Sequence, residues 1–158
     1  MHNSTQLTNN DNGVIIMKTS KDILASVLKT TQMGQVGIRA VTDYVVRADL
    51  KKALQDQLHE YDAIEREVNS IASLRGWELK DLDPMAKMMS KTYARTNLAF
   101  GNADSKVAAM MIQGNTRGII KGLKNLHHSA NPDNNIVMIS QKLLDCEAAN
   151  IKQMQGYL

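Results

Sequence analysis

Residues 48–75 read ADLKKALQDQLHEYDAIEREVNSIASLR. Apolar side chains recur in this stretch at spacings of three and four, which is the spacing of one face of an α-helix. The series runs Leu50, Leu54, Gln57, Tyr61, Ile64, Val68 and Ile71, with an amide in its third place. Gly76 follows, and glycine is a common residue just after a helix. The stretch therefore predicts one long amphipathic helix.

The same periodicity predicts more helices on both sides of this one. Long helices are expected at about 21–47, 103–128 and 134–156, and a shorter helix at about 84–100. No stretch alternates apolar and polar residues long enough to indicate a strand. Two long helices, a crossover and two more long helices predict an all-α, antiparallel four-helix bundle. Its one long crossover would carry the short extra helix.

The polar residues 1–18 show no periodicity and predict a flexible N-terminal tail, so the bundle is expected to span 19–158. Ser20 is expected to cap the first helix, and Asp22 to favour the positive end of its dipole.

Composition narrows the class of protein. The chain has 158 residues, of which 43% are hydrophobic, and this length and composition favour one globular domain. Cys146 is the only cysteine, so no internal disulfide can form and a reducing compartment is favoured. No apolar run reaches the roughly 18 residues of a membrane span, and Val14–Met17 is too short for a signal-peptide core. We expect a cytoplasmic protein without a membrane partner.

The net charge of +3 is small, and its distribution argues against nucleic acid as a partner. A nucleic-acid-binding face usually concentrates lysine and arginine, because each neutralised phosphate adds affinity. The most basic stretch, 103–131, spreads four cations over about seven helical turns. A solvated helix face accounts for this pattern.

Polar side chains interrupt the apolar face of each long helix near its middle. They are Gln35 in the first helix, Gln57 with Glu60 one turn away in the second, Asn115 in the third, and Glu147 and Asn150 in the fourth. A buried polar group without a partner costs roughly 1–3 kcal/mol. Polar groups at similar heights on four helices therefore predict either mutual hydrogen bonding or a shared ligand.

This arrangement resembles the ferritin-like superfamily, which includes ferritins, rubrerythrins and small bacterial domains of unassigned role. Met33-Gly34-Gln35-Val36-Gly37 and the segment from Asn150 to the Tyr157-Leu158 ending look closest to the bacterial branch. In iron-binding members, two helices each supply a Glu and two supply Glu-x-x-His, which together hold two metal ions.

The resemblance places Gln35 at the first-helix Glu, Gln57 or Glu60 at the second-helix position, and Asn115 or Gln113 at the third. Glu147-x-x-Asn150 has the fourth-helix spacing, with Asn in place of His.

The departures from this pattern decide the predicted function. A two-metal site must balance about four positive charges, and this centre offers at most Glu60 and Glu147 as carboxylates. We therefore expect an incomplete di-iron site, no cofactor, and an amide–carboxylate cluster that fixes helix register. The predicted role is a non-catalytic binding or structural protein. The alternative is an iron-binding protein or di-metal oxidoreductase of the ferritin/rubrerythrin type, and a third interpretation is a bundle that holds an apolar or haem-like ligand.

Two further patterns bear on partners. Methionines gather in the crossover and the start of the third long helix, at Met85, Met88, Met89, Met110 and Met111. Gap-filling explains them most simply, and any that are exposed would mark a surface for a protein partner. Gly114, Gly118 and Gly122 recur at spacing four, which lets a neighbouring helix approach closely or forms a dimer seam. We expect a homo-oligomer, most simply a dimer.

No catalytic set is predicted. The adjacent His127 and His128 point about 100° apart on a helix and are expected to interact with its C-terminal carbonyls. His59-x-x-Asp62 is expected on a solvated face. Asp145 and Glu147 flank Cys146, and acidic neighbours raise the pKa of a thiol rather than activate it.

Overall fold

The computed structural model describes residues 7–10 and 13–158, with side chains from Met17 onward. The described part of the chain is mostly helical, and its helices are α1 (Ser20–Val41), α2 (Ala48–Leu74), α3 (Pro84–Leu98), α4 (Ala103–His127) and α5 (Asn134–Gln155). A short 3-10 helix, η1 (Thr42–Tyr44), follows α1. The prediction of an all-α bundle is confirmed at the level of class. Among the described residues, no helix has the length and apolarity needed to cross a membrane.

An antiparallel hairpin precedes the helices, which the sequence analysis did not predict. Strands β1 (Leu7–Asn10) and β2 (Gly13–Ile16) pair with Leu7 opposite Ile16. The expectation that no stretch forms a strand is wrong for these two segments, and the flexibility of residues 1–18 stays a prediction. The β-branched run Val14-Ile15-Ile16 was the available signal, because such residues favour strands. Residues 1–6 and 11–12 of the predicted tail lie outside the described residues.

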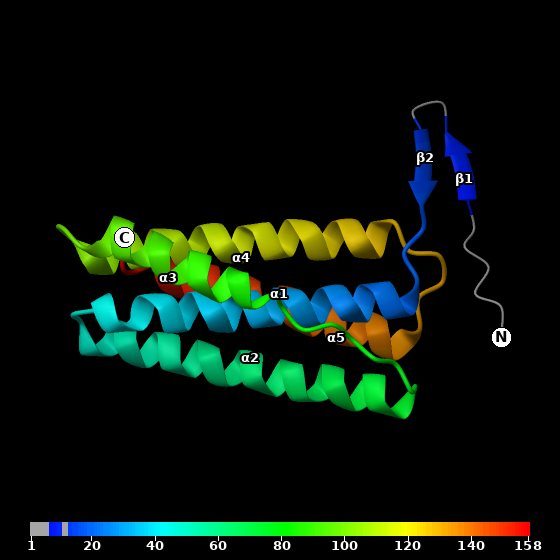
Figure 1. Ribbon diagram of the computed structural model, residues 1–158, viewed down its shortest axis with the longest axis horizontal. Helices are drawn as coiled ribbons and strands as arrows, with labels where there is room; N and C mark the ends of the chain where they lie inside the picture. Colours follow the sequence, from blue (N-terminus) through cyan, green and yellow to red (C-terminus); the bar gives the residue numbers. More distant parts are fainter. Residues whose placement is uncertain (1–6, 11–12) are drawn as a thin grey trace.

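Contacts at one end of the bundle join the first turn of α1 to the α4–α5 connection. The Lys18 amide donates to the His128 carbonyl at 2.8 Å, and the Asp133 amide donates to Ser20 Oγ at 3.0 Å. The last turn of α2 reaches the same place, because Arg75 pairs with Asp133 at 2.6 Å. The starts of α1 and α5 therefore lie beside the ends of α2 and α4 (Figure 1).

Contacts at the opposite end complete the register of the helices. The amides of Val46 and Arg47, just before α2, donate to the Asp104 carboxylate in the first turn of α4, at 2.8 and 3.0 Å. The Arg47 guanidinium also lies 4.9 Å from the ring centre of Tyr157, beyond α5. In Figure 1, α1 and α5 run in one direction and α2 and α4 run in the other. The short helix α3 lies against α1 and α4.

The same contacts correct two predicted helix ends. The first helix stops at Val41 and not at residue 47, because Val45 adopts an extended backbone and Asp104 holds the next two amides. Thr19, and not Ser20, caps α1: its hydroxyl accepts from the Asp22 amide, and the Asp22 carboxylate accepts from the Thr19 amide. This reciprocal pair is a capping box.

The inward face of α4 also differs from the predicted one. The spacing of apolar residues in the sequence of α4 predicts an inward face made by Ala108, Ile112, Ile119, Leu123 and Leu126. The structure buries Val107, Ala108, Met111, Asn115 and Gly118, and leaves Leu123 54% exposed. Gly118 and Gly122 face α5, which lies close to them. A Cβ atom at Gly122 would come within 2.9 Å of Leu144 Cδ2, as the close-approach interpretation predicts, whereas no other group lies within 4 Å of a Cβ atom at Gly114.

A buried amide on α1 holds the crossover in place. The Gln32 amide nitrogen donates to Glu65 Oε1 at 3.0 Å and to Asp81 Oδ1 at 2.8 Å. Its oxygen accepts the Leu82 amide at 2.8 Å, just before α3 begins. One side chain therefore joins α1, α2 and the connection to α3.

We predict that Gln32→Ala loosens the crossover more than it damages the rest of the bundle. Losing these hydrogen bonds should lower the free energy of unfolding by about 1–3 kcal/mol. Hydrogen exchange should accelerate most at residues 79–84. The matched control is Gln141→Ala, since Gln141 is exposed and bonds only to Asp145 in the next turn. Unchanged exchange at residues 79–84 in Gln32→Ala would contradict this role.

Candidate functional site

The predicted inward-facing polar side chains are buried on all four long helices. Gln35, Gln57, Asn115, Glu147 and Asn150 are each between 2% and 5% exposed. The sequence analysis left open whether Gln57 or Glu60 faces inward, and the structure selects Gln57.

The remaining candidates lie outside the centre. Glu60 lies on an exposed face, where its carboxylate accepts a hydrogen bond from the Cys146 thiol at 3.3 Å. Gln113 is also exposed, so Asn115 is the inward residue of α4.

These side chains form separate groups and do not converge on one point. Gln35 donates to Asp62 at 2.8 Å and to Glu65 at 2.6 Å, so it binds the carboxylates of α2. Gln57 donates to Gln153 on α5 at 2.7 Å. These bonds join neighbouring helices, and the predicted role of the polar residues in fixing helix register stays a prediction.

The central group contains a residue that the sequence analysis treated as apolar. The Tyr61 hydroxyl donates to Asn115 Oδ1 at 2.8 Å, which joins α2 to α4. Asn150 on α5 lies within 3.4 Å of the Tyr61 hydroxyl and 3.5 Å of the same Asn115 oxygen. Gly34 makes room for the ring, because any Cβ atom there would collide with Tyr61. The signal available in the sequence was that Tyr61 follows Gln57 by about one turn in the same apolar series.

Glu147 is the buried acid of the centre and has an unusual environment. It is 2% exposed, and its Oε2 atom has no hydrogen-bond partner among the described residues. Its carboxyl group packs against the backbone at Gly118, where a Cβ atom would overlap Oε1. Burial raises the pKa of Glu147 from its ordinary value of 4.5 to about 8, because it removes the water that stabilises the charged form. The carboxyl group is therefore largely protonated at neutral pH.

Neighbouring groups follow the same trend. Burial, and then the charge of Glu147, raise the pKa of Tyr61, so the phenol stays neutral. Burial and the hydrogen bond to Glu60 raise the pKa of Cys146 to about 12. The expectation that acidic neighbours leave this thiol unreactive agrees with that direction.

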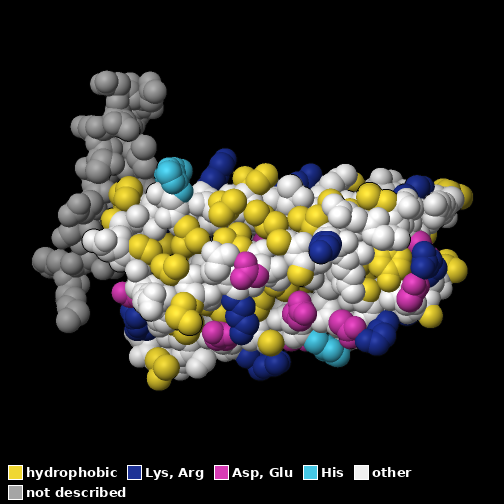
Figure 2. Space-filling view, turned by 180° about the vertical axis from the view of Figure 1, so that it is seen from behind, with side chains coloured by type: hydrophobic (Ala, Val, Ile, Leu, Met, Phe, Trp, Pro, Cys, Tyr) yellow, Lys and Arg dark blue, Asp and Glu magenta, His cyan; other side chains and the backbone are white. Residues whose placement is uncertain are grey.

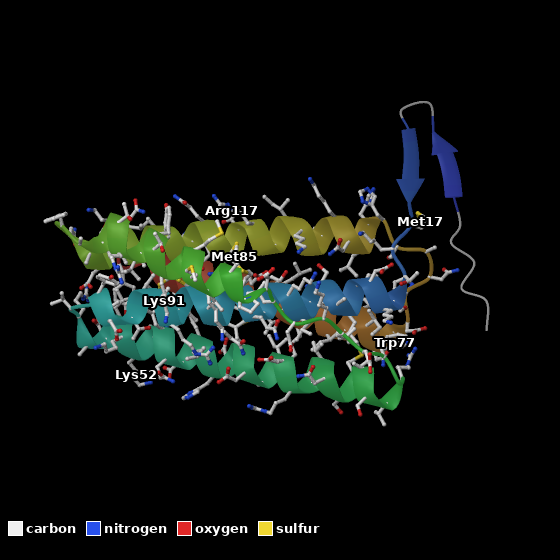
Figure 3. All side chains as sticks on the ribbon, viewed as in Figure 1. Met17, Lys52, Trp77, Met85, Lys91 and Arg117 are labelled. Carbon is white, nitrogen blue, oxygen red and sulfur yellow. The ribbon has the colours of Figure 1, made fainter. Side chains whose placement is uncertain are left out.

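A cavity of about 570 Å³ opens beside this central group. Its walls come from α1, α3 and α4, and Tyr61, Asn115 and Glu147 contribute to its inner surface. Most of the other lining residues are apolar or are glycines, including Met33, Gly37, Val41, Met89, Met110 and Gly114. Figure 3 marks Arg117 on the α4 side and Met85 and Lys91 on α3. The volume lies in the range of small-molecule sites, and the few polar groups on an apolar wall are typical of them.

The methionine cluster divides between the cavity and the surface. Met111 is buried and Met110 is partly buried, so gap-filling describes both of them. Met85, Met88 and Met89 are 64–68% exposed, so that expectation is wrong for α3, although Met89 also lines the cavity.

The donor set does not fit a di-iron centre. Two such ions require several carboxylates and imidazoles, whereas the buried candidate positions hold one acid, Glu147, and four amides, Gln35, Gln57, Asn115 and Asn150. Asp62 and Glu65 instead accept from the Gln35 amide. In the part of the chain that the structure describes, no three His, Cys, Asp or Glu side chains are placed to hold one metal ion.

Comparison with known proteins gives a fold likeness and no family. No family model matches the chain, and no curated protein does. One solved structure with a similar fold is "YcfI, a putative structural protein from Rhodopseudomonas palustris", with a TM-score of 0.56 and 15% sequence identity. The match covers 94% of this chain and 98% of that one, so the likeness extends over almost the whole fold.

We predict that Glu147→Gln stabilises the protein in a pH-dependent way. The folded state keeps a proton that the unfolded chain releases above pH 4.5, so the wild-type protein loses stability between pH 4.5 and about 8. Gln stays neutral throughout this range. The variant should therefore match wild type near pH 4.5 and exceed it by roughly 2–4 kcal/mol at pH 8.

Denaturant titrations across this pH range measure the difference. Glu78→Gln is the control, because Glu78 is exposed and should show no such trend. A Glu147→Gln variant that is less stable than wild type at pH 8 would show that the carboxylate is charged and paired.

Proposed function

We propose that this chain is a non-catalytic binding protein built on a ferritin-like, antiparallel four-helix bundle, with no complete di-iron site. The observation that carries the proposal is the apolar cavity whose inner surface includes Tyr61, Asn115 and Glu147. Of the positions that would hold metal in an iron-binding relative, Asn115 and Glu147 line this cavity, and Asn115 accepts a hydrogen bond from the Tyr61 hydroxyl there.

The ferritin-like assignment is supported by the order and length of the elements. Two long helices, a crossover with a short helix and two more long helices follow one another, as that class has them. Inward polar residues at mid-length on all four long helices add to the likeness. The glutamine, asparagine and tyrosine groups hydrogen-bond to neighbouring helices, as side chains that fix register do.

The alternative of an iron-binding or di-metal oxidoreductase has less support. It would need Glu60 to leave its exposed face and Glu147 to ionise beside it, and the amides cannot supply the missing charge.

Self-association stays a prediction, as do a cytoplasmic location and a protein partner at the methionines of α3. Figure 2 shows hydrophobic side chains gathered in the upper half of the face opposite α3, and charged side chains toward its lower edge. Exposed Ile120 and Leu123 on α4 and Met138 on α5 are available for a contact between copies.

We predict that the wild-type protein binds a neutral apolar probe in the cavity. N-phenyl-1-naphthylamine is suitable, because its fluorescence rises in apolar surroundings. Gly114→Leu should weaken its binding at least about tenfold, since Gly114 lines the cavity and no other group lies within 4 Å of the position of its Cβ atom. Gln113→Leu adds the same side chain one residue away, outside the cavity lining, and should change little.

An iron measurement on the same proteins separates the two functions. After anaerobic addition of ferrous iron and desalting, wild type and Glu147→Ala should both retain only background iron. Near-stoichiometric iron that depends on Glu147, without probe binding, would replace the binding function with an iron function.

A further inference from the structure

Three cations line the cavity, and each is free of an ion pair. Lys29 on α1 and Arg117 and Lys121 on α4 are exposed, and none of them pairs with a carboxylate in the described part of the chain. The cavity's only acidic lining residue is Glu147, which is buried and protonated at neutral pH. The accessible charge of the cavity is therefore positive.

The register of α1 and α4 places these cations at one end of the cavity. Lys18 bonds to His128 at one end of the helix pair, and Val46 bonds to Asp104 at the other. Lys29 therefore lies across from residues 117–121, while Val41 lies nearer residues 107–111. The end of the cavity near Lys29 is therefore positively charged, and the end near Val41 has none of these cations.

The far end of the cavity is apolar and lies beneath α3. Ala40 and Val41 on α1, Met110 on α4, and Met89 and Tyr93 on α3 line this part. The bond from Leu82 to Gln32 sets where α3 begins, and the helix then runs toward the end of α1 (Figure 1). From Lys29 to Val41 the α1 wall measures roughly 18 Å, at a rise of 1.5 Å per residue.

We propose that the cavity binds a single-chain amphiphile with an anionic headgroup, placing the headgroup at Lys29, Arg117 and Lys121 and the alkyl chain beneath α3. This inference rests on the proposed binding function and specifies the ligand class. Three observations support it: the unpaired cations, the apolar end beneath α3, and the polar inner surface that Tyr61, Asn115 and Glu147 form.

Glu147 lines the cavity near its charged end. Its carboxyl group packs against Gly118, one turn from Lys121, and its Oε2 atom has no partner among the described residues. A protonated carboxyl group can donate one hydrogen bond to an anionic oxygen. The same group would attract a cationic headgroup only after losing its proton, and the three cations would oppose that ligand.

The test compares four ligands that share one alkyl chain. Decanoate, decyl phosphate, decyltrimethylammonium and decanol are titrated into the full-length protein by calorimetry, below their micelle concentrations. Decanoate or decyl phosphate should bind at least about tenfold more tightly than decanol, and decyltrimethylammonium should bind most weakly. The ranking of the two anions distinguishes a carboxylate ligand from a phosphate ligand.

The charge dependence is tested with a triple variant, Lys29→Gln, Arg117→Gln and Lys121→Gln. It should weaken binding of the preferred anion about tenfold and leave decanol binding unchanged, because three solvent-exposed charges each contribute modestly. The matched control is Lys21→Gln, Lys51→Gln and Lys124→Gln, which removes the same net charge from exposed residues outside the cavity lining.

The possible results separate the headgroup proposal from the binding function. Equal binding of decanol and the anions, blocked by Gly114→Leu, would overturn the anionic headgroup and leave the binding function standing. Tighter binding of decyltrimethylammonium would also overturn it, with Glu147 as an ionised partner. No binding of any of the four ligands or of the neutral probe would overturn both proposals.

Discussion

The contact between the Glu147 carboxyl group and the backbone at Gly118 keeps the centre of the bundle free of charge at neutral pH. Because residue 118 has no side chain, α5 brings a carboxyl group to the backbone of α4 and shields it from water. This burial removes the water that would stabilise the ionised form, so the pKa of Glu147 rises to about 8. A single missing side chain thus helps to make the interior neutral.

The lack of charge at the centre favours hydrogen bonding over metal binding. Tyr61, Asn115 and Asn150 bond to one another across three helices, which satisfies polar groups that would otherwise destabilise the core. Such a set joins three helices through neutral groups, whereas a pair of metal ions needs fixed negative charge. The glycines on α1 and α4 that line the cavity leave beside it a volume that larger side chains would fill.

The number and approximate bounds of the helices could be predicted from the sequence, because the spacing of apolar residues indicates which face of an amphipathic helix points inward. The mid-helix amides and Glu147 were identified for the same reason, and Gln57 was distinguished from Glu60 only by the actual rotation of α2. On α4 this rule failed, since Met111 and Gly118 are buried while Leu123 is exposed. Tyr61 was missed because its ring fits an apolar pattern while its hydroxyl does not. The cavity depends on where Gln32 anchors the crossover, a contact between residues 50 positions apart.

The protonation state of Glu147 tests the central claim most directly. Carbon NMR of protein labelled at the glutamate side-chain carboxyls, with Glu147→Gln to assign the signal, follows each group through a pH titration. The account predicts one carboxyl that titrates near pH 8 and disappears in the variant. A Glu147 signal that titrates near the ordinary value of 4.5 would show a charged, stabilised carboxylate and would contradict the neutral interior.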